Sequence, residues 1–137
     1  MSNKNHPFAK NRLPVILWCC FIFFLSSIPG RDFPQVRLFP NADKVVHAGL
    51  YFVFCWLAHR AFRSTSNKAV AELSLYLALV AAVVYGCSDE FHQLYVMGRT
   101  ADIFDMLADA FGGLLYVAFF MVVVRPRIKT RSGLTAL

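Results

Sequence analysis

Four long apolar runs constrain this chain more than any other feature of its sequence. The runs cover residues 13–28, 45–62, 69–87 and 106–124. A helix that rises 1.5 Å per residue needs about 20 apolar residues to cross the hydrocarbon core of a bilayer. The chain is 58% hydrophobic over 137 residues, which is more apolar surface than one soluble core of this size could bury. The sequence therefore predicts an all-α fold, with residues 1–137 forming one integral membrane domain of four transmembrane helices.

The first run also admits a second interpretation, as a signal peptide. Lys4, Lys10 and Arg12 precede it, and it ends just before Pro29. We expect the segment to be retained, because no Ala-x-Ala cleavage site follows and the Ile28–Pro29 pair suits cleavage poorly.

The distribution of basic residues predicts the orientation. The N-terminal arm and the tail at 125–137 contain Lys and Arg but no Asp or Glu, and the segment between the second and third runs carries Arg60, Arg63 and Lys68. By the positive-inside rule these three segments face the cytoplasm, so both termini are predicted to be cytoplasmic. The remaining two connections are mixed or acidic and face outward. The net charge of +6 reflects this bias and requires no nucleic-acid partner. The bilayer is the expected partner, and the sequence specifies no protein partner.

Nearly all of the unusual polar residues fall at the outward ends of the runs. Two of them lie inside apolar sequence: His47 is about one turn into the second run, and Asp109 is more than a turn into the fourth. Helix capping and the helix dipole account for most of the outward acids, but not for Asp109, which needs a partner, a proton or a wet cavity. We expect the outward ends to converge, with His47 near Glu90 and Asp105. The candidate binding residues are Asp43, Lys44, His47, Asp89, Glu90, Gln93, Arg99, Asp102, Asp105 and Asp109.

One residue of this set has two interpretations. Asp43 is either a helix cap or a functional group that fixes the tautomer of His47, four residues later on the same face. Met97-Gly98 predicts a turn between the last two runs. The four cysteines show no Cys-x-x-Cys spacing, and we interpret them as small apolar side chains.

The ordered set of polar motifs resembles the VanZ-like family. The motifs are Leu25-Ser26-Ser27, Asp43-Lys44-x-x-His47 with Tyr51, Asp89-Glu90-x-x-Gln93, and Gly98-Arg99-x-x-Asp102-x-x-Asp105 with Gly112 beyond. The resemblance extends over residues 13–124. This chain has Met97 where the family commonly has Pro, and Asp109 where it commonly has Asn. The resemblance implies a multi-pass protein of the bacterial cytoplasmic membrane and a link to tolerance of teicoplanin-type glycopeptides.

The sequence is compatible with three functions. In the first and favoured hypothesis, Lys44, Arg99 and the helix N-termini bind an anionic envelope ligand, either a lipid head group or a cell-wall precursor. In the second, the protein is a metal-dependent hydrolase, although no nucleophile motif or His-Glu-x-x-His signature is present. Its divalent metal, Mg or Mn, would be the protein's one cofactor, held by Asp43, His47, Asp89, Glu90, Asp102 and Asp105. In the third, the polar residues only lock the helices together in a structural or assembly protein.

Overall fold

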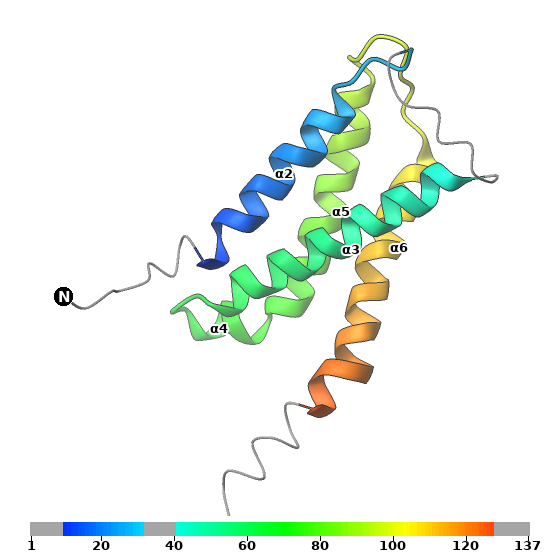
Figure 1. Ribbon diagram of the computed structural model, residues 1–137. Coiled ribbons are helices and arrows are strands. Elements are labelled where there is room, and N and C mark those ends of the chain that lie inside the picture. The colour runs from blue at the N-terminus through cyan, green and yellow to red at the C-terminus, as the bar shows by residue number, and fades with distance from the viewer. Residues whose placement is uncertain (1–9, 32–40, 128–137) are drawn as a thin grey trace, which may run out of the picture.

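The computed structural model describes residues 10–31 and 41–127, and every regular element in those ranges is helical (Figure 1). The predicted N-terminal arm up to residue 9, residues 32–40 of the first loop, and the tail from residue 128 lie outside the described residues. The elements are α2 (Leu13–Ser26), α3 (Ala42–Arg63), α4 (Lys68–Glu72), α5 (Ser74–Gln93), α6 (Ile103–Phe119) and the π-helix η1 (Phe120–Val124). The prediction of an all-α fold is confirmed over these ranges.

Three helical segments in the described ranges are long and apolar enough to cross a membrane: Ala42–Arg63, Ser74–Gln93 and Ile103–Arg127. The fourth, α2, is apolar but has only 14 residues. That length corresponds to about 21 Å at 1.5 Å per residue, which is shorter than a hydrocarbon core of about 30 Å. The structure is therefore that of a membrane helix bundle, while four crossings and cytoplasmic termini stay predictions.

The third apolar run differs from its prediction as a single helix over 69–87. The helix is interrupted at Leu73, where the backbone leaves helical geometry. The Ser74 hydroxyl donates to the carbonyl of Ala71 at 2.7 Å. The second part, α5, then continues to Gln93. It can do so because the polar residues of its last turn are buried inside the bundle, where other side chains satisfy them.

Helix α3 lies at the centre of the bundle and packs against α2, α5 and α6 (Figure 1). Its contact with α6 is a close approach of two backbones. A Cβ atom on Gly112 would stand 2.1 Å from the carbonyl oxygen of Ala48. The core around this crossing includes Tyr51 and Cys55, both with no exposed surface. The outer faces instead expose large apolar side chains such as Val84 and Val122, as expected of surfaces that contact lipid.

The C-terminal ends of α2 and α5 and the N-terminal ends of α3 and α6 gather at one end of the bundle (Figure 1). The two loops at this end touch, since the Gly30 amide donates to the carbonyl of Met97 at 3.0 Å. Gly98 follows with φ +74°, a backbone conformation that glycine adopts without strain. The predicted turn at Met97-Gly98 is confirmed, and these loops hold the polar helix ends together.

Candidate functional site

The structure gathers most of the predicted polar residues into one group at this end, which we call the polar cluster. Its members are Ser26, Asp43, Lys44, His47, Asp89, Glu90, Gln93, Asp102, Asp105 and Asp109. The predicted convergence of the helix ends is confirmed, because His47 lies 3.8 Å from Asp105 and faces Glu90. That these residues bind a ligand stays a prediction.

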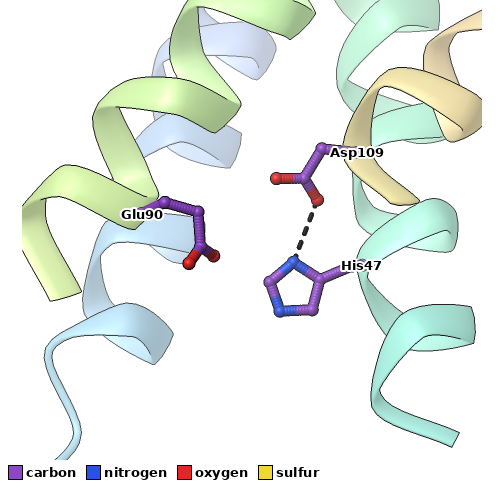
Figure 2. Close-up of side chains that lie close together, drawn as sticks. All are labelled: His47, Glu90 and Asp109. Atoms are coloured by element: carbon purple, nitrogen blue, oxygen red, sulfur yellow. Dashed lines mark hydrogen bonds and ion pairs between the residues drawn. The ribbon is translucent and has the colours of Figure 1, made fainter. Parts of the chain in front are cut away.

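His47, Glu90 and Asp109 form a buried triad at the heart of the polar cluster (Figure 2). They come from α3, α5 and α6, and each offers one ligand atom within 4.8 Å of the other two. Nδ1 of His47 is hydrogen-bonded to Oδ1 of Asp109 at 2.9 Å. Glu90 and Asp109 have no exposed surface, whereas the His47 side chain is 18% exposed. The triad therefore reaches the molecular surface on the His47 side.

The second carboxylate oxygen of Asp109 is buried and has no hydrogen-bond partner among the described residues. It points toward α5, where Gly86 leaves room for it: a Cβ atom at that position would lie 2.8 Å from Oδ2. A buried polar atom without a partner is costly, and such atoms are rare in native structures. A proton or a cation at Oδ2 would remove that cost.

Lys44 lies at the edge of the polar cluster and is surrounded by carboxylates. Its Nζ donates to Asp102 at 2.6 Å and to Asp105, and it lies 3.0 Å from Asp43. The hydrogen bond from Lys44 holds the pKa of the Asp102 carboxyl below its usual value. Asp102 also caps α6, since its side chain accepts from the amide of Phe104 at 2.9 Å. Asp102 is therefore one of the outward acids that helix capping accounts for.

A second set of hydrogen bonds ties α2 and the α6 start to α5. The Ser26 hydroxyl donates to Asp89 at 2.6 Å, and the Gln93 amide donates to Glu90 at 3.2 Å. The backbone amide of Asp102 donates to the other oxygen of Glu90 at 2.9 Å. Ser26 was missing from the predicted site. Its position next to Ser27 at the end of the first apolar run was the available signal.

Two residues have roles that differ from the predicted ones. Asp43 lies in the first turn of α3 and does not cap it, because Asn41 occupies the N-cap position. Its side chain is 61% exposed, and the contact with His47 that sequence spacing suggested for it is made by Asp109 instead. Arg99 binds the end of α2. It donates to the carbonyls of Ile28 and Leu25 at 3.1 and 3.3 Å, which fixes the C-terminal end of α2.

The chemistry of the triad suits a divalent cation. One imidazole nitrogen and two carboxylates are a donor set that accepts Mn²⁺ or Zn²⁺. Metal–ligand distances of about 2.1 Å place opposite ligands about 4.2 Å apart, so a span of 4.8 Å would close by several tenths of an ångström on binding. This set is smaller than the predicted one. It includes Asp109, which the predicted set lacked, and it excludes Asp43 and Asp102, which lie beside Lys44 instead.

Comparison with known proteins gives one result at the family level. A family model described as VanZ/LLP1 matches residues 13–124. The match extends from the start of α2 to the end of η1 and so includes the whole polar cluster. No curated protein and no solved structure gives a significant match.

Proposed function

This chain belongs to the VanZ/LLP1 family, and from that premise we propose that it handles an anionic ligand of the bacterial envelope at its polar cluster. The ligand is a lipid head group or a lipid-linked cell-wall precursor that carries phosphate. It binds through a divalent cation held by His47, Glu90 and Asp109. The protein acts in the bacterial cytoplasmic membrane with the polar cluster facing outward, and the link to teicoplanin tolerance is part of the same proposal.

The observation that carries the proposal is the unpartnered oxygen of Asp109, whose carboxylate lies close to Glu90 and His47. Two buried carboxylates on adjacent helices repel each other unless a positive charge or a proton lies between them. A divalent cation would supply that charge and give Asp109 Oδ2 a partner. It would leave positions of its coordination shell open on the His47 side, where the triad reaches the surface.

The cation also explains how an acidic cluster could attract an anion. We expected Lys44 and Arg99 to bind the head group directly. Lys44 is instead paired with carboxylates, and Arg99 donates to backbone carbonyls. A phosphate oxygen that coordinates the bound metal needs neither side chain to change partners, because the metal carries its own local positive charge. This geometry supports metal-bridged binding over direct binding by the two cations.

The proposal is tested by measuring lipid phosphate binding with and without metal. The full chain is placed in nanodiscs and titrated with undecaprenyl phosphate in the presence of Mn²⁺ or of EDTA. We expect saturable binding with Mn²⁺ and at least a tenfold weaker affinity with EDTA, because loss of the metal removes the ligand's main positive contact. Glu90→Gln should behave like the wild type in EDTA even when Mn²⁺ is present.

Asp43→Asn is the matched control, since it removes one carboxylate of the polar cluster outside the triad. It should retain metal-dependent binding. The proposal fails if undecaprenyl phosphate binds equally well in Mn²⁺ and EDTA, or if Asp43→Asn and Glu90→Gln weaken binding to the same extent while both variants remain folded.

The hydrolase hypothesis keeps one specific argument in its favour. A metal held by the triad would activate a water, with a neighbouring carboxylate of the polar cluster as the candidate general base, and could support attack on a phosphate ester. Release of inorganic phosphate from undecaprenyl pyrophosphate by the wild type, and its loss in Glu90→Gln, would favour this function over binding alone.

The structural hypothesis is favoured by the hydrogen bonds that join Ser26, Asp89 and Gln93 across α2 and α5. If the cluster served only to lock the helices, Glu90→Gln would lower thermal stability, and neither metal nor lipid phosphate would raise it. Under the binding proposal, Mn²⁺ raises the wild-type melting temperature because it binds only the folded state.

A further inference from the structure

A second polar site lies at the opposite end of the bundle, where α3 ends and α6 continues into η1. It is a cavity of about 370 Å³ whose lining includes His59, Arg60, Arg63, Tyr116 and Phe120. We propose that this cavity binds an anionic phospholipid of the adjacent leaflet, with the phosphate at the arginines and the upper acyl chains against the aromatic wall. The site is remote from the polar cluster, so the inference is independent of the proposed function.

The charge of the cavity favours an anion. Arg60 and Arg63 line it, and no Asp or Glu is among its lining residues. Arg60 is held in place, because its guanidinium donates to the Asn11 side chain at 3.1 Å and to the Lys10 carbonyl at 2.6 Å. The described residues that flank the bundle at this end, 10–12 and 125–127, also contain no Asp or Glu and therefore do not neutralise the arginines. A lipid phosphate can.

The walls of the cavity suit the rest of a lipid molecule. Trp56 and Phe119 line it and are 45% and 46% exposed, as expected of aromatic rings that contact acyl chains near an interface. The floor carries a polar pair, in which His59 Nδ1 and the Tyr116 hydroxyl lie 2.6 Å apart. Both residues are buried, at 5% and 4% exposure. The cavity therefore combines a basic rim, an apolar wall and a polar floor.

The helix that borders the cavity changes geometry at this point. Helix α6 ends at Phe119 and η1 occupies Phe120–Val124, and both Phe120 and Val124 line the cavity. A π-helix inserts extra backbone into a turn and is frequently found at functional sites. Here η1 lines the cavity together with the end of α3, which is an observation independent of charge.

The test uses the fluorescence of Trp56 and lipids that carry bromine, which quenches indole on contact. The chain has two tryptophans, so a Trp18→Phe background makes Trp56 the reporter. We expect dibromo-phosphatidylglycerol to quench Trp56 more strongly than dibromo-phosphatidylcholine with the same acyl chains. Arg63→Gln should reduce this preference roughly fivefold, because one arginine near a lipid phosphate contributes that factor to affinity.

Arg127→Gln is the matched control, because it removes one positive charge from the same end of the bundle but outside the cavity. It should leave the preference unchanged. Equal quenching by the two lipids, or equal losses in both variants, would overturn the proposal and assign the effect to general surface charge. If Trp18→Phe lowers stability, native mass spectrometry can instead count the phosphatidylglycerol molecules retained by the wild type, Arg63→Gln and Arg127→Gln. A loss in Arg63→Gln alone would support the proposal, and equal losses in both variants would overturn it.

Discussion

At the scale of single residues, Asp109 places a carboxylate more than a turn inside α6. One oxygen accepts from His47, and the other has no partner among the described residues. Leaving a buried polar group without a partner costs about 1–3 kcal/mol. A bound cation would offset that cost, because the Asp109 carboxylate already lies close to His47 and Glu90 and needs little rearrangement. Asp109 is thus the residue on which the proposed metal site depends most.

Asp102 supplies a pH-dependent prediction at the same scale. Its carboxyl has a lowered pKa because Lys44 donates to it. A carboxyl whose pKa is lower in the folded state stabilises the fold above its ordinary pKa, and that contribution is lost as pH falls through the lowered value. Asp102→Asn keeps the helix cap and removes the ion pair. The wild type should therefore be the more stable at pH 7, and the difference should begin to shrink as pH falls below the ordinary value of 3.8.

This prediction is checked by thermal unfolding of both proteins in detergent between pH 3 and pH 7. A stability difference that stays constant across this range would contradict the assigned ion pair.

The sequence predicted which polar residues would meet, but not which atoms would pair. His47 and Asp109 were identifiable because each interrupts an apolar run where a polar group is costly. Asp43 was an equally good partner for His47 by spacing, and only the rotation of α3 against α6 turns it outward and brings Asp109 to Nδ1. Such rotations depend on packing across helices, which one helix's periodicity does not contain.

At the scale of elements, the crossing of α3 and α6 sets the position of the triad, because His47 and Asp109 come from these two helices. The crossing is close at Gly112, where a Cβ atom would stand 2.1 Å from the Ala48 carbonyl oxygen. Gly112→Ala should destabilise the bundle by about 1–3 kcal/mol, since backbone cannot move aside as a flexible side chain can.

Gly49→Ala is the control for this prediction, because a Cβ atom there would have no neighbour within 4 Å. Its melting temperature in detergent should equal that of the wild type or exceed it, as alanine favours a helix over glycine. Similar melting temperatures for both variants would show that the α3–α6 contact is looser than described.

The places of the four apolar helices were predictable from apolar runs, whereas their lengths and ends were not. Helix α5 extends to Gln93 rather than stopping near Cys87, because Asp89, Glu90 and Gln93 are buried inside the bundle. A run defined by hydropathy ends at the first polar residues, even when those residues continue the helix. The break at Leu73 and the π-helix at Phe120 likewise had no signal in apolar periodicity.

At the scale of the whole molecule, the bundle carries carboxylates at one end and arginines at the other. This asymmetry predicts that the loop at Met97, which is 74% exposed, faces outward. In a cysteine-free background, Met97→Cys should react with a membrane-impermeant maleimide in intact cells. Ser66→Cys, in the connection between α3 and α4, should react only after lysis.

The reverse labelling pattern would invert the orientation and place the polar cluster in the cytoplasm. Gln35, a second position expected to be accessible from outside, lies outside the described residues.

The central claim is that His47, Glu90 and Asp109 hold a divalent cation, and Mn²⁺ electron spin-echo spectroscopy tests it most directly. The full chain in nanodiscs should bind Mn²⁺ with a ¹⁴N modulation from one imidazole. His47→Gln should abolish the modulation, Asp109→Asn should abolish binding, and Asp43→Asn should preserve both. Wild-type protein that binds no Mn²⁺, or that binds it without nitrogen coupling and independently of Asp109, would contradict the claim.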